Sequence, residues 1–441
     1  MHARNKTMWT RLLLALWGSL LAAGCGAPAE GEPGAWTSQA LPLRGRTPQS
    51  IRVSAGFSHG LLVAPDGTVR AWGGNTYGQL GIGNTTGQST PVTVPGLTNV
   101  VAVAGGGYHS LALLADGTVR AWGFNAYGEL GTGNTTSVYT PAIVSGLTGV
   151  VAIAAGENHS LALLSDGTVR AWGNNVFGQI GDGTNTDRST PVAVPGLTNV
   201  VAISTRQSSS VALLADGTVW AWGYNTTGEL GNNTNTNRNT PVGVFGLSNV
   251  VALSTGRYHS LALLADGTVW GWGGNAYGEL GTSGSPRTYI PVAVSGLSGV
   301  VAIAAGNYWS LAVGSDGIVR SLGDNSVGQL GDGTTLARNT PVAVSGLTGA
   351  TGVAAGIYFS LAVRSDGTVR TWGYNDYGQL GDGTTTQRIT PVQPLNLPAG
   401  HARRLAAGKQ HSLALLPDGT VRAWGLNTYG QLGDGTTTQR N

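Results

Sequence analysis

The sequence predicts an all-β protein, a β-propeller of four-stranded antiparallel blades with eight repeat units of about 50 residues. Three observations support this fold class. First, an Asp-Gly pair recurs at a step of 50 residues, with one step of 52. Second, each copy consists of short runs typical of strands, separated by Gly, Asn, Thr and Pro, and no run shows a helical period. Third, one such sheet cannot bury its own faces, so neighbouring copies must stack.

Two landmarks define the repeat units. The Asp-Gly pairs begin at Asp66, Asp116, Asp166, Asp216, Asp266, Asp316, Asp366 and Asp418. A Trp-Gly pair follows each of them at a constant spacing, except that Leu322 replaces the Trp in one copy. We expect this Trp to fill the layer between neighbouring blades, because aromatic side chains bury a large apolar area. The predicted propeller domain spans 47–441, with units near 51–100, 101–150, 151–200, 201–250, 251–300, 301–350, 351–402 and 403–441.

The unit 151–200 illustrates the expected order of strands. The runs VVAIAAG, HSLALL, TVRAWG and TPVAV are predicted as its first to fourth strands. Asp166-Gly167 lies between the second and third runs, where an Asp-Gly pair favours a tight hairpin because both turn positions adopt positive φ. A stretch rich in Gly, Asn and Thr separates the third run from the fourth.

The N-terminal residues predict export. Residues 1–24 have the pattern of a signal peptide, with Arg4, Lys6 and Arg11 before an apolar run that is too short to span a bilayer. Cys25 follows small residues, as in a bacterial lipobox, so we expect it to be lipidated; an ordinary signal peptide with an incidental Cys is the alternative. Residues 25–46 are then a flexible tether. This predicts a protein anchored by lipid in the bacterial cell envelope, at the outer membrane or cell surface, or else secreted.

Composition and charge exclude several classes of function. A single Cys excludes a disulfide framework, a Cys-based zinc site and an iron–sulfur cluster. The formal charge of +3 comes from the leader: without its three cations, 21 basic residues balance 21 acidic ones. We therefore expect no nucleic-acid partner, no contact with the membrane except through the lipid anchor, and a monomer.

The repeat itself resembles a known family. The pattern G-x-x-H-S-L-A-L-x-x-D-G-T-V-x-x-W-G-x-N-x-x-G occurs at 106–128 and again at 156–178. It is similar to the RCC1 (regulator of chromosome condensation) repeat, and the resemblance covers residues 51–441. The resemblance implies a β-propeller. Members of the family usually have seven blades, so seven is the alternative to the eight counted along this chain.

The eighth copy ends before the Thr-Pro pair that opens the fourth strand in the other copies. Propellers often close by borrowing a strand from the other terminus, and residues of roughly 36–50, which contain Arg46-Thr47-Pro48, are a candidate for it. A truncated reading frame is the other explanation, and the sequence leaves both open.

One face of the propeller is the predicted binding surface. In an up-and-down blade, the first-to-second and third-to-fourth connections share a face, and their residues vary between copies and are rich in Tyr, Phe, Trp and Arg. These residue types dominate binding hot spots. The alternative is that the aromatic side chains only pack on the adjacent blade. The predicted binding residues are Tyr108, Phe124, Tyr224, Arg257, Tyr258, Tyr308, Trp309, Tyr358, Phe359 and Tyr374.

Catalytic and metal sites are not predicted. His59, His109, His159, His259 and His411 occupy one repeat position, so each belongs to a different blade, and structural hydrogen bonds explain them better than a metal cluster. The Asp of each Asp-Gly pair is a turn residue. The Gly-Asp-Gly-Thr stretches lack the oxygen spacing of an EF-hand loop, which favours turns stabilised by side-chain hydrogen bonds. No nucleotide-binding or hydrolase motif is present. We expect no enzyme activity and no cofactor.

These observations predict a non-catalytic protein-binding scaffold of the bacterial cell envelope. The alternative is a secreted enzyme inhibitor that resembles the RCC1-like β-lactamase inhibitors. A guanine-nucleotide exchange factor, as the family resemblance also suggests, ranks third. The repeat spacing never exceeds 52 residues and leaves no room for an inserted wedge, and an exported protein would not meet a cytosolic GTPase.

Overall fold

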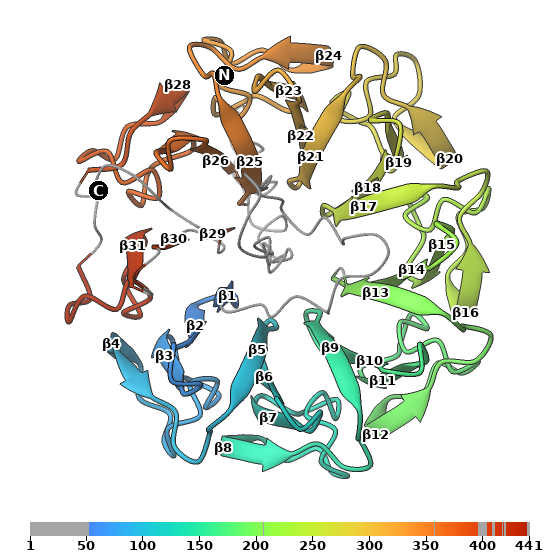
Figure 1. The fold of residues 1–441 in the computed structure, drawn as a ribbon, viewed down its shortest axis with the longest axis vertical. Helices are drawn as coiled ribbons and strands as arrows, with labels where there is room; N and C mark the ends of the chain where they lie inside the picture. The colour runs from blue at the N-terminus through green and yellow to red at the C-terminus, as the bar shows by residue number, and fades with distance from the viewer. Residues whose placement is uncertain are drawn as a thin grey trace, which may run out of the picture.

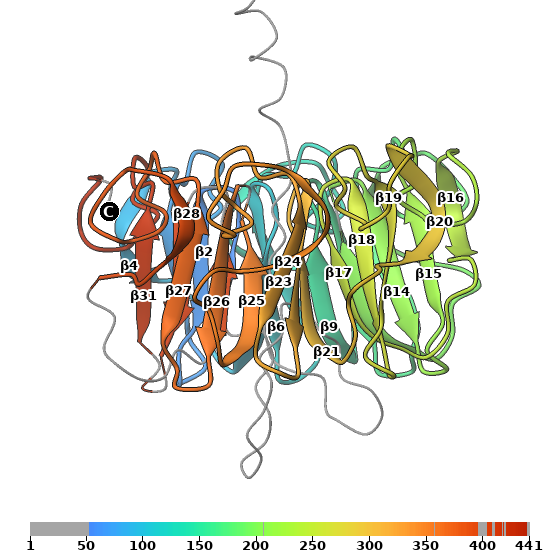
Figure 2. The ribbon, with the colours of Figure 1, turned by 90° about the horizontal axis from the view of Figure 1, so that it is seen from above.

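The computed structural model describes residues 53–205, 207–356, 358–395, 404–407, 411–416, 418 and 420–438. Eight antiparallel sheets surround a central axis, and Figure 1 shows them as the blades of a β-propeller. Seen from the side, the blades form a flat disc (Figure 2). The predicted fold class is confirmed, with eight blades and not seven. The signal segment, Cys25, the tether and the 36–50 segment lie outside the described residues.

The first four blades have these strands. Blade 1 contains β1 (Val53–Ala55), β2 (His59–Val63), β3 (Val69–Gly73) and β4 (Gln88–Thr93). Blade 2 contains β5 (Val100–Gly105), β6 (His109–Leu114), β7 (Val119–Gly123) and β8 (Val138–Ile143). Blade 3 contains β9 (Val150–Ala155), β10 (His159–Leu164), β11 (Val169–Gly173) and β12 (Arg188–Ala193). Blade 4 contains β13 (Val200–Thr205), β14 (Ser209–Leu214), β15 (Val219–Gly223) and β16 (Arg238–Gly243).

The remaining blades continue the pattern. Blade 5 contains β17 (Val250–Thr255), β18 (His259–Leu264), β19 (Val269–Gly274) and β20 (Arg287–Ala293). Blade 6 contains β21 (Val300–Ala305), β22 (Trp309–Gly314), β23 (Val319–Gly323) and β24 (Arg338–Ala343). Blade 7 contains β25 (Ala350–Ala355), β26 (Phe359–Arg364), β27 (Val369–Gly373) and β28 (Arg388–Val392). Blade 8 contains, among the described residues, β29 (Arg404–Ala407), β30 (His411–Leu415) and β31 (Val421–Gly425).

Within each blade the chain runs up and down, as blade 3 shows. Ala162 in β10 pairs with Ile153 in β9 and with Arg170 in β11. The pairing of β11 with β12 shifts register between Ala171 and Gly173. Gly173 has a φ of 104°, and a Cβ added there would lie 2.6 Å from a backbone oxygen. Only glycine therefore fits where the third strand turns into the long loop that follows.

The hydrophobic core consists of layers between the blades. Trp172 of blade 3 is fully buried, in one cluster with Leu111, Leu130 and Val144 of blade 2. Its indole Nε1 donates a hydrogen bond to a backbone oxygen of blade 2 at 2.8 Å. Leu322, which replaces the Trp in blade 6, is also fully buried. The prediction that this repeat position fills the layer between blades is confirmed.

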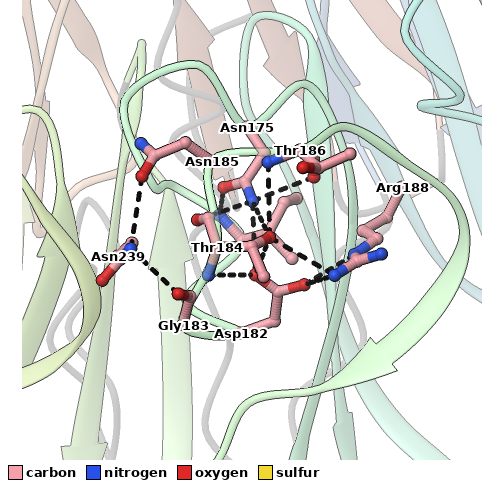
Figure 3. A network of polar contacts seen from close by, with 9 residues as sticks. Asn175, Asp182, Gly183, Thr184, Asn185, Thr186, Arg188 and Asn239 are labelled. Atoms are coloured by element: carbon pink, nitrogen blue, oxygen red, sulfur yellow. Dashed lines mark hydrogen bonds and ion pairs between the residues drawn. The ribbon is translucent and has the colours of Figure 1, made fainter.

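The long loop of blade 3 is held by a network of side-chain bonds (Figure 3). The Oδ1 atom of Asp182 accepts hydrogen bonds from the backbone N and the Oγ1 of Thr184, at 3.0 and 2.8 Å. Its Oδ2 atom accepts from Arg188 Nε at 2.6 Å. Asn239, on β16, donates to the Gly183 backbone oxygen at 3.0 Å and so connects blade 4 to this loop. The turn predicted for the Gly-Asp-Gly-Thr stretch is confirmed.

Blade 8 meets blade 1 through non-covalent contacts. Trp72 Nε1 donates to the backbone oxygen of Gln431 at 2.9 Å. The backbone N of Gly435 donates to the backbone oxygen of Ser89 at 2.5 Å. The chain thus closes into a ring between its last and first described blades. The strand proposed to come from residues 36–50 stays a prediction, because that segment lies outside the described residues.

Candidate functional site

The loops between first and second strands and those between third and fourth strands meet on one face of the disc. In blade 1 the backbone N of Gly74, after β3, donates to the backbone oxygen of Ser58, before β2, at 2.7 Å. Aromatic side chains from both kinds of loop touch one another here, and we call this surface the aromatic face. It comprises Phe57, Tyr77, Tyr108, Phe124, Tyr127, Phe177, Tyr224, Tyr258, Tyr277, Tyr308, Tyr358, Tyr374 and Tyr377.

The first aromatic cluster lies at the boundary between blades 1 and 2. The rings of Tyr77 and Tyr108 have centroids 5.0 Å apart, and Tyr77 contacts Phe124 at the same distance. Phe57 meets Tyr108 edge-on at 5.3 Å. Tyr77 is 38% exposed, so the cluster presents an apolar surface with polar phenol groups to solvent.

The second cluster lies at the boundary between blades 5 and 6. Tyr258 and Tyr308 stack with their centroids 5.0 Å apart, and Tyr277 meets Tyr308 at 5.2 Å. The guanidinium carbon of Arg257 lies 4.9 Å from the centre of the Tyr258 ring, a cation–π contact. Burial raises the pKa of the Tyr308 phenol, and the hydrogen bond with Tyr258 raises it further. The phenol therefore stays neutral at physiological pH.

The two clusters lie on opposite sides of the ring, because they are four blades apart in a ring of eight. Figure 1 shows β5 to β7 and β21 to β23 facing each other across the axis. Smaller contacts lie between them: Phe177 meets Tyr224 at 5.1 Å, and Tyr374 meets Tyr358 at 6.3 Å. The aromatic face thus surrounds the central axis and does not form a single patch.

The predicted placement of Trp309 and Phe359 on this face is wrong. Both side chains are fully buried. They open β22 and β26, at the repeat position that histidine holds in other blades, and Trp309 Nε1 hydrogen-bonds Ser360 Oγ of the next blade at 3.1 Å. Successive residues of a strand point to opposite sides, so the preceding residues, Tyr308 and Tyr358, reach the face while these two enter the core.

The other predicted binding residues lie on the face and are partly exposed: Tyr108, Phe124, Tyr224, Arg257, Tyr258, Tyr308, Tyr358 and Tyr374. Their role in binding stays a prediction. Sequence reasoning missed Tyr77, Phe177 and Tyr277, which contact aromatic residues of other loops. It also missed Tyr127 and Tyr377, which contact Phe124 and Tyr374 within their own loops. The signal was present, since an aromatic residue precedes the Gly of the long loop in most copies. The prediction used only positions whose residue type varies between copies, and this position is aromatic in most of them, so it was missed.

The histidines are structural. The Nε2 atoms of His59, His109 and His159 lie 2.9, 3.0 and 3.0 Å from a serine Oγ of the next blade, and His259 makes the same bond at 2.9 Å. Complete burial lowers the pKa of His59, His109 and His159 to about 3. These four histidines thus make the predicted structural hydrogen bonds between blades. For His411 the prediction is wrong: neither ring nitrogen has a partner among the described residues, because the next blade has Gly60 where the others have serine. Among the described residues, no three His, Cys, Asp or Glu side chains are grouped so that they could hold a metal ion.

The Asp-Gly turns occupy the opposite face. Asp66 Oδ1 accepts hydrogen bonds from the backbone N and the Oγ1 of Thr68, at 2.9 and 2.7 Å. The other copies repeat both bonds, except that Ile318 of blade 6 donates only its backbone N to Asp316. These bonds hold the pKa of the Asp66 carboxyl below its usual range. A carboxylate stabilised in its charged form is a poor general acid, so the predicted turn role accounts for these residues.

The sequence profile of the RCC1-like domain matches residues 148–441. Profiles of the RCC1 repeat match 66–113 and 116–163, and a second repeat profile matches 51–79 and 100–129. The chain belongs to the RCC1-like family.

Solved structures share this RCC1-like fold. Prp20p from Saccharomyces cerevisiae, described with its binding properties to Gsp1p and histones, is 26% identical, with a TM-score of 0.62 over 78% of this chain and 90% of Prp20p. A second structure of yeast Prp20, bound to Kap60, is 24% identical, with a TM-score of 0.61 over 84% and 89%. Human WBSCR16 is 24% identical, with a TM-score of 0.65 over 79% of this chain and 99% of WBSCR16.

The described part of this RCC1-like propeller contains no helix long and apolar enough to cross a membrane. Its chemistry lies in the loops that the blades hold in place. The aromatic face offers ring surfaces, phenol groups and one stacked guanidinium, which suit the recognition of another molecule.

Proposed function

We propose that this RCC1-like protein is a non-catalytic protein-binding scaffold of the bacterial cell envelope, and that the aromatic face is its binding surface. The observation that carries the proposal is the pair of exposed tyrosine clusters on opposite sides of one face. A protein partner that covers the central axis contacts both clusters at once. Tyr supplies a large amphipathic contact area with few rotatable bonds, so binding costs little side-chain entropy.

The blades hold the binding loops in place before a partner arrives. The loop after β3 hydrogen-bonds to the loop before β2 through Gly74 and Ser58, and the equivalent bond in blade 6 joins Asp324 to Tyr308 at 2.9 Å. In the long loop of blade 1, Asn75 donates to two backbone oxygens at 2.9 and 3.0 Å. Loops that are ordered in the free protein lose little entropy on binding.

Two further findings support a protein partner in the envelope. The family relative Prp20p binds proteins, as its structure with Kap60 and its described binding to Gsp1p and histones indicate. The leader pattern of residues 1–24 and the position of Cys25 support export and lipid anchoring of this chain. A secreted enzyme inhibitor would use the same face, so the identity of the partner separates these two functions.

The test is affinity capture from envelope and culture-supernatant extracts with the full chain as bait. A triple variant, Tyr108→Ala/Tyr308→Ala/Tyr358→Ala, removes side chains from both clusters and from blade 7. A control variant, Ile143→Ala/Phe245→Ala/Leu395→Ala, removes apolar side chains that are 61%, 59% and 58% exposed and lie outside the two kinds of loop that form the aromatic face. We expect a protein that the native and control baits retain and that the aromatic variant, matched in melting temperature, loses.

Equal retention by all three baits would contradict the proposed surface. A captured hydrolase that loses activity in the complex would indicate an inhibitor. A captured GTPase whose nucleotide release accelerates would indicate an exchange factor and would contradict the scaffold proposal.

A further inference from the structure

Three side-chain hydrogen bonds recur where one blade meets the next. Between blades 1 and 2, His59 Nε2 lies 2.9 Å from Ser110 Oγ, which donates to the Gln79 backbone oxygen at 2.8 Å. Trp122 Nε1 donates to the same oxygen at 2.9 Å. All three bonds recur between blades 2 and 3 and between blades 3 and 4. They also recur between blades 6 and 7, where Trp309 takes the place of the histidine.

Blade 8, which lies between blades 7 and 1 in Figure 1, lacks most of these bonds on both of its sides. Between blades 7 and 8, Phe359 replaces the histidine, and Trp424 Nε1 has no partner among the described residues. Only one of the three bonds remains there, from Ser412 Oγ to the Gln379 backbone oxygen at 2.9 Å. Every other blade keeps at least two of the three bonds on one of its sides.

Gly60 explains the loss of bonds between blades 8 and 1. His411 is buried without a partner among the described residues, because Gly60 stands where the other blades have serine. A Cβ added to Gly60 would lie 2.5 Å from the Trp72 ring, so this ring takes the space of a serine side chain. The bond from Trp72 Nε1 to the Gln431 oxygen remains, at 2.9 Å. A buried imidazole that has lost water and gained no partner destabilises the closed boundary.

The apolar layer between blades 8 and 1 is also the smallest among the described residues. Its six buried members are Val53, Ala55, Trp72, Ala406, Leu413 and Leu415. The layer between blades 1 and 2 has eleven buried members, and no other layer has fewer. Buried apolar area is the main term that stabilises such a contact. The boundary between blades 8 and 1 is therefore short of both apolar contacts and hydrogen bonds.

We propose that the boundary between blades 8 and 1 is a seam that opens in the folded protein, with blade 8 moving as a unit while blades 1 to 7 stay stacked. Blade 8 follows blade 7 along the chain, and the contacts that part at the seam are non-covalent. In a protein built of repeats, stability is approximately a sum of terms for each unit and each boundary, so the weakest boundary opens first. The inference concerns the ring itself and does not depend on the proposed function.

Opening of the seam changes the aromatic face. Tyr429, in the long loop of blade 8, is 52% exposed. A Cβ added to Gly74 of blade 1 would lie 3.5 Å from the Tyr429 Cβ, and the backbone of Gly74 is bonded to Ser58, which follows Phe57 of the first aromatic cluster. In the closed ring Tyr429 therefore lies beside this cluster, and in the open ring it does not. A ligand that contacts both sides of the seam binds the closed ring and increases its population.

The test is hydrogen–deuterium exchange of the full chain at pH 7, measured by mass spectrometry. The variant Gly74→Cys/Tyr429→Cys can close the seam with a disulfide, because 3.5 Å between Cβ atoms suits that bond. Cys25→Ser in every protein leaves the engineered pair as the only thiols. In the reduced variant, amides of β30 should exchange about a hundredfold faster than those of β10, which is also a central strand. Oxidation should slow exchange in β30 at least tenfold and leave β10 unchanged.

Tyr127→Cys/Asn174→Cys is the matched control, because it places the same pair of repeat positions at the boundary between blades 2 and 3. Its oxidation should leave the exchange of β30 fast. Equal exchange of β30 and β10 in the reduced proteins, which needs no disulfide, would overturn the seam. So would fast exchange of β30 that persists once mass spectrometry shows the seam disulfide complete, since strand fraying within blade 8 would then explain it.

Discussion

Replacing Trp172 with alanine removes one of the largest fully buried side chains from the layer between blades 2 and 3. Truncating a buried Trp to Ala costs about 3–5 kcal/mol of unfolding free energy, since the surrounding structure relaxes only partly into the cavity. The lost indole hydrogen bond adds little. Its acceptor, the Glu129 backbone oxygen, still receives a bond from Ser160 Oγ at 2.9 Å. We therefore expect the cavity to account for most of the loss, about 4 kcal/mol.

The measurement is urea unfolding at 25 °C, monitored by circular dichroism. The free energies of unfolding are compared for proteins whose dependence on urea concentration has the same slope. Trp172→Leu should cost about half as much, near 2 kcal/mol, because a leucine leaves a smaller cavity; Leu322 fills the same position in blade 6. Val176→Ala is the control, since Val176 is 57% exposed and its truncation should change stability by less than about 0.5 kcal/mol. A loss below about 1 kcal/mol for Trp172→Ala would refute the argument that these layers are the core.

Three further predictions concern other contacts between and within blades. Burial lowers the pKa of His159 to about 3, so at pH 5 this imidazole takes up a proton only in the unfolded chain, and the native protein loses stability. Between pH 7 and pH 5 the free energy of unfolding in urea should therefore fall by about 2 kcal/mol less in His159→Gln than in the native protein. An equal fall in both proteins would contradict this. Asp182→Asn should lower the free energy of unfolding in urea by less than about 1 kcal/mol, because Asn232 accepts the same bonds from a threonine in blade 4; a larger loss would show that the ion pair with Arg188 stabilises the loop more than this. Trp309→Ala should lower the melting temperature, because the side chain is buried, without reducing partner capture per folded molecule. Loss of capture with an unchanged melting temperature would show that Trp309 belongs to the binding surface.

Much of the fold could be predicted from the sequence, because the relevant signals are local. In the Asp-Gly hairpin only the glycine has a positive φ, 78° at Gly67, and not both turn positions as expected. The aspartate contributes through its side chain, since Thr68 bonds to Asp66 two positions away. This local signal recurs at a step of 50 residues, which predicts equal units that stack on one another. The repeated Trp was predictable as core for the same reason.

The candidate site could be predicted only in part. The face that carries the variable loops follows from the up-and-down order of strands, so Tyr108 and Tyr308 were found. The neighbouring Trp309 was misplaced, because one step along a strand moves a side chain from the face to the core, and the sequence does not show where the strand begins. Tyr277 was missed, because its partner Tyr308 is 31 residues away and belongs to another blade.

The sequence by itself determined the β content, the repeat length, the hairpins and the aromatic layers, since each depends on residues close together in the chain. Only the tertiary structure decided which loop residues meet across a blade boundary. Tyr258, Tyr277 and Tyr308 come from three loops of two blades, and their rings meet only because these blades pack side by side. Such a contact is a property of packed neighbours, and no single stretch of sequence contains it.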